Sequence, residues 1–298
     1  MHKKPTICVV GSINMDLTVS TSVIPNQGET VLGESFATYP GGKGANQAVA
    51  AARLGSEVKM VGAVGNDVFG RSLMDHLQAE GIDTSATALL DETATGTATI
   101  ILSNNDNRII VAPGANQFVT PSYVEKYRSA LAGSDIILMQ MEIPIETIAY
   151  VSAVAEESGV PVILNPAPYQ PLPAAVVSKI DFMTPNEIEA DLLKNDLISN
   201  ELLEKWITTK GERGASYYFQ GKEVLVPGYT VPVEDTTGAG DTFNGALAAQ
   251  LGRGEFVKSA VSFANAAAAL SVTGKGAQGG MPALEEVQSF LKERSSGL

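Results

Sequence analysis

The chain has 298 residues, 44% of them hydrophobic and 18% charged, a composition typical of a globular protein with a large core. Its 33 acidic and 20 basic side chains give a formal net charge of -13, which argues against binding to nucleic acid or to an anionic membrane surface. The single cysteine, Cys8, excludes a disulfide framework and fits a reducing cytoplasm, and two histidines argue against histidine-based triads and zinc motifs. Because no long apolar run occurs, we expect no membrane-spanning segment.

Short runs of apolar and β-branched residues alternate with helical patterns along most of the chain. The runs predict buried strands at Ile7–Val10, Val58–Val64, Ile136–Met141, Val160–Leu164 and Asp181–Thr184. The segments between them predict helices over Ala45–Leu54, Gly70–Glu80, Tyr123–Ala132 and Ile145–Glu157. Each helix is followed by a glycine suited to a left-handed C-cap, namely Gly55, Gly81, Gly133 and Gly159. This alternation predicts an α/β fold with a mostly parallel central sheet flanked by helices on both faces.

Two more helix boundaries can be predicted. Thr120 suits an N-cap, with Pro121 at the first helical position, where its missing N–H costs nothing. From Pro282 onward an amphipathic C-terminal helix is indicated by the spacing of Leu284, Val287 and Leu291.

Two stretches, Leu17–Tyr39 and Thr95–Ala112, break the strand–helix alternation. Both have an extended, partly alternating pattern, and the second places Thr97–Leu102 and Arg108–Val111 around the turn-rich segment Ser103–Asn107. We interpret the two stretches as a small sheet that projects from the main body, a candidate lid. The alternative is an antiparallel extension of the central sheet, and the sequence favours neither.

The strongest chemical signal is the segment Asp235–Gly245, with the sequence DTTGAGDTFNG. Its small residues Gly238–Gly240 open a predicted helix that runs to about Leu251, so unpaired N–H groups can close on an anion. Asp241 lies in the first turn of that helix. The pair suits phosphoryl transfer, because amides gather the charge of the transferred group while a carboxylate deprotonates an acceptor hydroxyl. For Asp241 taken alone, the alternative is an N-capping aspartate after a tight turn.

Two further polar clusters precede or follow predicted elements. Gly41–Gln47 lies directly before a helix, so its backbone can approach a polyhydroxylated ligand while Lys43 and Asn46 form hydrogen bonds; a loop with a solvated lysine is the alternative. Asn14 and Asp16 follow the first strand and face the same side, where both can bind sugar hydroxyls; a polar turn is the alternative. Neither a dinucleotide-binding G-x-G-x-x-G motif after the first strand nor a P-loop is present.

Taken together, these segments resemble the ribokinase branch of the carbohydrate and nucleoside kinase family, in order and over nearly the whole chain. The resemblance is carried by Gly11–Asp16, Gly41–Gln47, Met139–Glu142, Asn165–Pro168, Thr184–Ala190 and Asp235–Gly245. It implies a ribokinase-like three-layer fold, with residues 1–298 as one catalytic domain and a small β-sheet lid built from about 15–40 and 95–112. It also implies transfer of the ATP γ-phosphate to the 5-hydroxyl of D-ribose, the entry step of ribose catabolism.

The resemblance also implies roles for individual residues. Asp241 would be the catalytic base, and the anion hole would be formed by the backbone of Gly238, Ala239 and Gly240. The sugar would be held by Asn14, Asp16, Gly42, Lys43, Gly44, Ala45, Asn46, Glu142 and Asp241. ATP would be bound by Asn186, Thr209, Lys210, Gly211, Glu212, Arg213, Gly214, Gly240 and Asn265.

Two metal ions are implied in the same way. Asn186 and Glu189 would organise Mg²⁺, largely through water, as suits an ion that dehydrates reluctantly. A monovalent cation, usually potassium, would be held by Asp235, Thr237, Ser271, Gly274, Gly276 and Gly280. The expected partners are therefore ribose, ATP, Mg²⁺ and K⁺, together with a second copy of the chain in a homodimer formed through the lids, and neither nucleic acid nor membrane.

The chain departs from the family pattern between Asn186 and Thr209, where the family usually has a longer stretch. Here only Asp191–Trp206 separates the two motifs, so we expect the edge of the sheet beneath the adenine to be trimmed or rewired. Two alternative functions stay open: a kinase for another sugar, such as deoxyribose or a ketohexose, and a catalytically weak sugar-binding regulatory protein.

Overall fold

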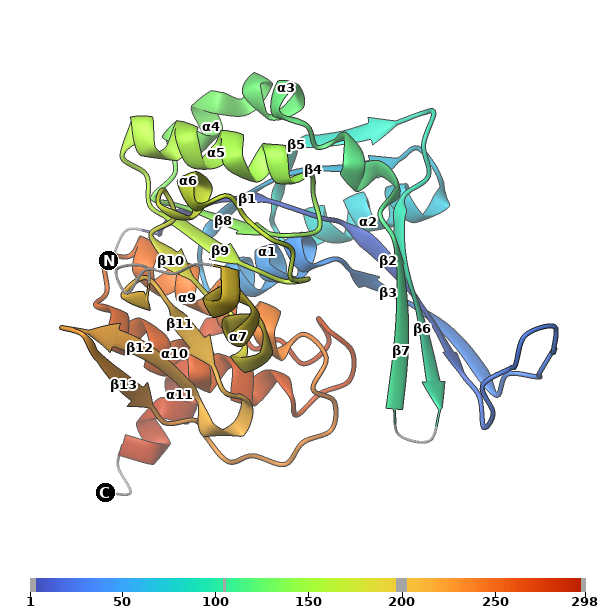
Figure 1. Cartoon of the computed structure of the whole chain (residues 1–298). Helices are drawn as coiled ribbons and strands as arrows, with labels where there is room; N and C mark the ends of the chain where they lie inside the picture. The colour runs from blue at the N-terminus through green and yellow to red at the C-terminus, as the bar shows by residue number, and fades with distance from the viewer. Residues whose placement is uncertain (1–3, 104–105, 197–202, 296–298) are drawn as a thin grey trace.

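A six-stranded parallel sheet lies at the centre of the molecule (Figure 1). The computed structural model describes residues 4–103, 106–196 and 203–295. Across the sheet the strands follow the order β10 (Phe182–Met183), β9 (Val162–Asn165), β8 (Ile136–Gln140), β1 (Thr6–Val10), β4 (Glu57–Gly65) and β5 (Asp83–Leu90). All five predicted strands are therefore present, with ends that differ by a few residues, whereas β5 was not predicted.

Two separate cores cover the two faces of this sheet. The central strand β1 directs Ile7 and Val9 into one core and Cys8 and Val10 into the other, as the two-residue period of a strand requires. The first core is completed by α1 (Lys43–Arg53), α2 (Val68–Ala79), α9 (Ala239–Gly252), α10 (Val257–Ser271) and α11 (Leu284–Ser295). The second is completed mainly by α3 (Pro121–Val124), α4 (Arg128–Ala132), α5 (Ile145–Ser158), α6 (Ala174–Val177) and α7 (Glu187–Asp196). The predicted three-layer α/β fold is confirmed.

Most predicted helix boundaries are confirmed, with two exceptions in the segment from Tyr123 to Gly133. Gly55, Gly81 and Gly159 have positive φ, and Thr120 accepts a hydrogen bond from the N–H of Tyr123. The predicted helix over Tyr123–Ala132 is wrong as a single element, because a short 3-10 turn, η2 (Glu125–Tyr127), separates α3 from α4. Gly133 follows the five-residue α4 with a φ of -94, so the predicted left-handed cap there is also wrong.

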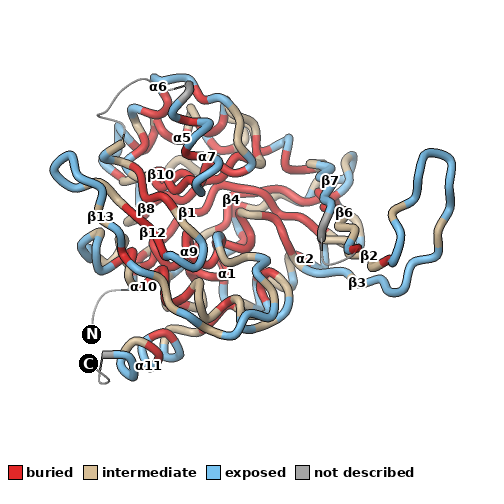
Figure 2. The backbone as a smooth tube through the Cα atoms, turned by 60° about the horizontal axis from the view of Figure 1, so that its bottom comes forward, coloured by how far each residue is buried: buried red, intermediate tan, exposed pale blue. Residues whose placement is uncertain are grey.

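The two stretches that broke the alternation form a sheet of their own, beside the main body (Figure 1). Its order is β3 (Ser35–Gly41), β2 (Asn14–Ser20), β6 (Gly96–Ser103) and β7 (Asp106–Ala112). The separate sheet that we interpreted as a candidate lid is therefore present, and the alternative of an extension of the central sheet is wrong. The inner pair β2–β6 is parallel, whereas both outer pairs are antiparallel. The connection between β2 and β3 is largely exposed (Figure 2), and positions 104 and 105 of the predicted turn lie outside the described residues.

The edge of the central sheet beyond β10 is interrupted, as the short segment Asp191–Trp206 predicts. The next strands form a separate antiparallel sheet, β11 (Ile207–Thr209), β12 (Ala215–Phe219) and β13 (Lys222–Val226). It joins the central sheet through isolated parallel bridges that pair Met183 with Trp206 and Asn186 with Thr209. Residues 197–202 of the short segment lie outside the described residues. Among the helices that are described, none is long and apolar enough to cross a membrane.

Candidate active site

Two glycine-led helices, α1 and α9, begin at the same place in the molecule. At the start of α1, Gly42 has a φ of +87, and a Cβ atom there would lie 2.6 Å from the backbone N of Asn14. A Cβ atom at Gly44 would lie 2.6 Å from the backbone N of Ser12. At the start of α9, the N-cap residue Gly238 has a φ of +79, and its Cβ atom would lie 2.4 Å from the carbonyl oxygen of Ala277. Only glycine fits such close approaches, so both clusters serve backbone packing around the site.

The Asp241 carboxylate lies between these helices and is 8% exposed. Its Oδ2 accepts a hydrogen bond of 2.9 Å from Nδ2 of Asn46, and its Oδ1 accepts one of 2.9 Å from Nε2 of Gln47. The residue does not cap its own helix, because the N-cap Gly238 has no side-chain partner and Asp241 points to α1 instead. The alternative of a simple capping aspartate is therefore wrong.

A buried amide network extends from Asp241 across the ends of the central strands. Gln47 accepts a hydrogen bond of 2.7 Å from Nε2 of Gln140 and donates to Oδ1 of Asn165 at 3.2 Å. Thr184 in turn donates to Asn244, at 2.6 Å, and Asn244 donates to the carbonyl of Gly240. Asn165 closes the connection by donating to the carbonyl of Thr184. The aspartate and the turn before it are thus held by one continuous set of hydrogen bonds.

The predicted sugar-binding residues meet at the same end of the sheet. Asn14 is buried, and its Oδ1 accepts a hydrogen bond of 2.7 Å from Nδ2 of Asn116. The carboxylate of Glu142 accepts hydrogen bonds from the hydroxyl of Ser12, at 2.5 Å, and from the backbone N–H of Lys43, at 3.2 Å. These hydrogen bonds hold the side chains of Asn14 and Glu142 near the carboxyl ends of the central strands.

Charged side chains lie close together at this end of the sheet, and the pKa values of Asp16, Lys43 and Glu189 are shifted there. Burial and the nearby carboxylates of Glu142 and Asp241 raise the pKa of Asp16 to about 7, against the opposing charge of Lys43. Burial opposes the positive charge of Lys43, yet the carboxylates around it, led by Asp241, raise its pKa. Burial also raises the pKa of Glu189, which the Lys43 charge opposes. The ammonium of Lys43 therefore lies among four carboxylates.

The predicted magnesium pair, Asn186 and Glu189, forms a capping box at the start of α7. Each side chain accepts a 2.9 Å hydrogen bond from the backbone N–H of the other residue. Among the described residues, no group of three or more histidine, cysteine, aspartate or glutamate side chains is arranged so that it could hold a metal ion directly. The oxygens of this pair are compatible with an ion held largely through water, because the carboxylate and amide keep unused acceptor positions.

The predicted nucleotide-binding segment continues from that pair. Thr209 donates its N–H to the carbonyl of Pro185, next to Asn186. Gly214 approaches the end of β13 so closely that a Cβ atom would lie 2.3 Å from the carbonyl oxygen of Val226. The same carbonyl accepts a 3.0 Å hydrogen bond from Nδ2 of Asn265, which brings α10 to this loop. The loop between β11 and β12 contains the 3-10 turn η3 (Gly211–Arg213). Two side chains of this loop form ion pairs, Lys210 with Glu223 and Arg213 with Glu187.

The predicted cation residues form two turns that contact each other. Oδ1 of Asp235 accepts from the N–H of Thr237 at 2.9 Å, and Oδ2 accepts from the N–H of Gly276 at 2.8 Å. Partial burial works against the charge, but these hydrogen bonds hold the pKa of Asp235 below its ordinary value. The rest of the loop closes on itself, since a Cβ atom at Gly280 would lie 1.9 Å from the carbonyl oxygen of Ser271 and one at Gly274 would lie 2.8 Å from Cα of Gly280.

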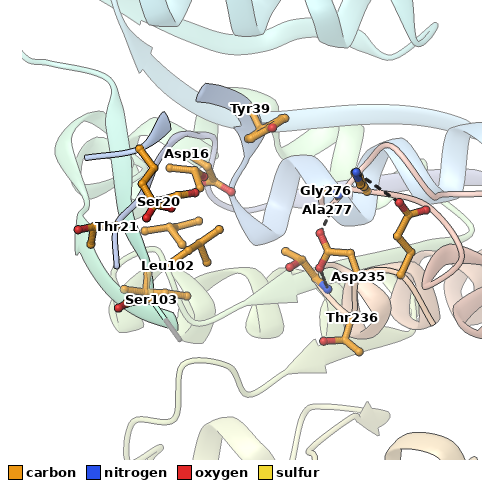
Figure 3. Close-up of a pocket in the computed structure, with 17 residues that line it drawn as sticks. Asp16, Ser20, Thr21, Tyr39, Leu102, Ser103, Asp235, Thr236, Gly276 and Ala277 are labelled. Carbon is orange, nitrogen blue, oxygen red and sulfur yellow. Dashed lines mark hydrogen bonds and ion pairs between the residues drawn. The ribbon is translucent and has the colours of Figure 1, made fainter. Parts of the chain in front are cut away.

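An open cleft of about 720 Å³ separates the small sheet from those turns (Figure 3). Asp16, Tyr39 and Leu102 line the wall made by the small sheet, while Asp235 and Gly276 line the opposite wall. The buried polar groups around Asp241 lie outside this lining. Asp16 thus borders the cleft, whereas the Asp241 carboxylate is buried outside its lining.

Comparison with known proteins agrees with this geometry. A family model described as "pfkB family carbohydrate kinase" matches residues 4–284. The chain belongs to the pfkB family of carbohydrate kinases. It is 47% identical to the ribokinase of Bacillus subtilis (strain 168) over 289 residues, which cover 96% of this chain and 99% of the relative. It is also 36% identical to the deoxyribokinase of Salmonella typhi, over 96% of this chain and 98% of the relative.

Solved structures of the same family superpose closely on this ATP-dependent sugar kinase. The ribokinase of Thermotoga maritima, 36% identical, has a TM-score of 0.88 and covers 97% of this chain and 99% of its own. The ribokinase of Arabidopsis thaliana, solved in complex with ribose and ATP and 31% identical, has a TM-score of 0.90 over 97% and 99%. The ribokinase-like fold expected from the sequence is confirmed.

Several residues of the amide network carried no predicted role. Gln47, Gln140 and Asn165 lie inside motifs that we singled out, but nothing in the sequence shows which buried amides meet the aspartate. Gln278, which donates to Oδ1 of Asn46 at 2.8 Å, lies within the glycine-rich loop assigned to the cation. Asn116 follows a Pro-Gly turn and had no signal at all.

The raised pKa of Asp16 predicts a specific pH dependence of stability. The folded protein keeps the Asp16 proton up to about pH 7, whereas the unfolded chain releases it near the ordinary value of 3.8. Asp16 therefore lowers the free energy of unfolding as pH rises between these values. Relative to wild type, Asp16→Asn should gain stability by about 2 to 4 kcal/mol across this range and no further above it. Urea unfolding from about pH 5 to pH 8.5, with the exposed-residue variant Asp75→Asn as control, measures this, and a pH-independent difference would contradict it.

Proposed function

We propose that this kinase transfers the γ-phosphate of ATP to the 5-hydroxyl of D-ribose and yields D-ribose 5-phosphate. The observation that carries the proposal is the Asp241 carboxylate, fixed by Asn46 and Gln47 directly after the turn Gly238–Gly240. The similarity to ribokinases over the whole chain supports ribose as the acceptor. We place the enzyme in the cytoplasm, where the thiol of Cys8 stays reduced.

In the proposed reaction Asp241 is the base. Each carboxylate oxygen accepts one amide hydrogen bond and keeps a second acceptor position for the ribose hydroxyl. As the ribose O5–P bond forms, the hydroxyl proton passes to Asp241, and the bond from the γ-phosphorus to the bridging oxygen breaks to release ADP. The N–H groups at the start of α9, from Gly238, Ala239 and Gly240, stabilise the charge of the transferred phosphoryl group. The N–H of Ala239 donates to the carbonyl of Thr236 at 3.3 Å in this structure, a long contact that the phosphoryl group would replace.

The remaining subsites follow from the same arrangement. Ribose is held by Asn14, Asp16, Glu142, Asn46 and the Gly42–Ala45 backbone, together with the ammonium of Lys43. ATP lies along Asn186 and Thr209–Gly214, with Asn265 supporting that loop. Asn186 and Glu189 would hold Mg²⁺, largely through water, and the ion would supply charge neutralisation on the phosphates. The small sheet acts as a lid over the cleft and, through its edge strands, forms a homodimer.

A coupled assay of ADP release tests the proposed function. The acceptors are D-ribose, 2-deoxy-D-ribose and a ketohexose, each at several concentrations. Ribose should give by far the highest kcat/KM, because a site built to pair a hydroxyl rejects the analogue that lacks it by a factor of about 10⁴ or more. A preference for deoxyribose would favour the activity named for the Salmonella relative, and no sugar-dependent ADP release would favour a binding protein.

Replacement of Asp241 tests its proposed role as the base. Asp241→Asn should fold normally and lose on the order of 10² to 10⁴ in kcat, the usual contribution of a positioned proton acceptor. Circular dichroism and steady-state kinetics measure the two effects, with Asp75→Asn as the matched control. Turnover near the wild-type rate would remove Asp241 from the mechanism.

We also propose that a monovalent cation activates the enzyme from the loop around Asp235. The proposed ligands are the carboxylate of Asp235, the carbonyl of Thr237 and backbone or side-chain oxygens of Ser271, Gly274, Gly276 and Gly280. Such oxygens suit K⁺, because carbonyl oxygens can replace its hydration shell. Because the Asp235 side chain joins the turn before Gly238 to Gly276, order in this loop aims the anion-binding N–H groups.

Activation by potassium should therefore appear in kcat more than in the KM for ribose. Potassium, sodium and a bulky organic cation, compared at constant ionic strength, should activate in that order. Asp235→Ala should reduce the potassium response, whereas the control Glu234→Ala, which removes a neighbouring exposed carboxylate, should keep it. Equal rates with all three cations would rule out a functional cation site here.

The proposed homodimer rests on the apolar edge of the lid. Strand β7 presents Ile109 and Ile110, which are 54% and 66% exposed, and an uncovered edge strand is a pairing surface. Ile110→Lys should therefore convert a dimer into a monomer, while Val68→Lys, at an exposed position of α2, should leave the dimer intact. Light scattering at micromolar concentration measures this, and a wild-type monomer with full activity would contradict the proposal.

A further inference from the structure

A second row of hydrogen bonds leaves Asp241 in the direction opposite to Gln140. Nδ2 of Asn46 contacts Oδ2 of Asp241 at 2.9 Å, and Nε2 of Gln278 contacts Oδ1 of Asn46 at 2.8 Å. Oε1 of Gln278 contacts Nε2 of His76 at 2.6 Å. The row links the proposed base, through two buried amides, to a partly buried histidine on α2.

The direction of every bond in this row is set by the carboxylate. An ionised aspartate only accepts, so the NH₂ group of Asn46 must face it and the Asn46 oxygen must face away. That oxygen requires a donor, so the NH₂ group of Gln278 faces Asn46, and the Gln278 oxygen faces His76. The last acceptor then requires a proton on Nε2 of His76.

The loop that carries Gln278 is held from a second side. The backbone carbonyl of Gln278 accepts a 2.6 Å hydrogen bond from Nη1 of Arg53, which also donates to the carbonyl of Met281. Arg53 is in turn paired with Glu80, two hydrogen bonds joining the guanidinium to the carboxylate. Gln278 is 6% exposed, so neither its backbone nor its amide is free to reorient without breaking buried contacts.

We propose that Gln278 is a positioning residue of the phosphoryl transfer: held by Nε2–H of His76, it fixes the amide of Asn46 so that Asp241 keeps its hydrogen-bond donor. This inference rests on the proposed function, because it deepens the role of the same site. It assigns His76 a structural task at the end of the row and makes the glycine-rich loop part of the support of the base.

The position of the His76 proton tests the order of the bonds without any activity measurement. With ¹⁵N-labelled histidine, the chemical shifts of the two ring nitrogens distinguish the tautomers at a pH near 9, where histidine side chains are ordinarily neutral. We expect His76 to carry its proton on Nε2. A proton on Nδ1 alone would overturn the inference, because Gln278 would then have to face the other way.

The kinetic test compares two substitutions of similar size. Gln278→Glu replaces the donor by an acceptor, so Asn46 must turn its NH₂ group away from Asp241, and we expect kcat for ribose to fall by about ten- to a hundredfold. Gln278→Met removes both groups without forcing Asn46 to turn, so its loss should be several times smaller. The KM for ATP should change little in either variant.

Two histidine variants and a control complete the design. His76→Gln keeps a donor near the place of Nε2 and should retain kcat within about twofold of wild type, whereas His76→Phe should show a loss comparable to that of Gln278→Met. Gln78→Ala, which removes a glutamine amide on α2 bonded to Thr84, should behave as wild type.

The outcomes distinguish a failure of the positioning role of Gln278 from a failure of the proposed function. Wild-type kcat in Gln278→Glu, or equal losses in the glutamate and methionine variants, would overturn the positioning role. If the wild-type protein leaves ribose unphosphorylated while His76 carries its proton on Nε2, the proposed function is wrong and the order of hydrogen bonds stands.

Discussion

A carboxylate that accepts hydrogen bonds from two amides dictates the organisation of the candidate active site. Asp241 receives one donor from each of two consecutive residues of α1, Asn46 and Gln47. Because an amide has its donor and acceptor at opposite ends, each contact determines the orientation of the next amide outward. On one side the row of hydrogen-bonded amides ends at Gln140. The buried oxygen of Gln140 lies next to Gly11 and has no hydrogen-bond partner among the described residues. That oxygen faces away from Asp241 because the NH₂ group of Gln140 donates to Gln47, whose own NH₂ group donates to the aspartate.

The contact between α1 and α9 makes this arrangement possible. Gly245, one turn beyond Asp241, allows the helix backbones to approach so closely that a Cβ atom would lie 2.6 Å from Cβ of Ala50 and 2.7 Å from the carbonyl oxygen of Gln47. The glycines at 42, 44 and 238 allow close approach of a different kind, of each helix start to the neighbouring backbone at Asn14, Ser12 and Ala277. Small residues thus set the distance across which the amides and the carboxylate meet, and a polar network so enclosed is strengthened by its low-dielectric surroundings.

How much could be predicted depended on how local the signal was. Apolar runs revealed the strands around β1, and capping residues such as Thr120 revealed helix starts, because both depend on neighbouring residues. The sequence Asp83–Leu90 of β5 carries few large apolar side chains and was missed for that reason. The helix predicted over Tyr123–Ala132 is interrupted by the 3-10 turn η2, a local change of hydrogen-bond pattern that the periodicity of apolar residues does not reveal.

For the candidate site, too, residues with a local signal could be predicted and residues joined by long-range contacts could not. Asp241, Asn14 and Lys43 stand out as polar residues beside glycine turns or strand ends, so their neighbourhood was predictable. The network behind them was not, because Gln47 meets Gln140, Asn165 and Asp241 across separations of 93, 118 and 194 residues. Periodicity and capping contain no information about which buried amide pairs with which over such distances. The Asn14–Asn116 contact, across 102 residues, belongs to the same class.

The parallel pairing of β2 with β6 has a consequence for the order in which the chain acquires its structure. Each outer pair of the small sheet is a local hairpin, but the inner pair joins segments separated in sequence by α1, β4, α2 and β5. We expect its strands to meet only after the central sheet has brought together their N-terminal ends, where Asn14 pairs with Gly96. Long-range closure of this kind carries an entropic cost that early contacts must already have met. We therefore expect the cleft wall to be the last part of the enzyme to mature during refolding, so that a nearly complete α/β body precedes any capacity to bind sugar.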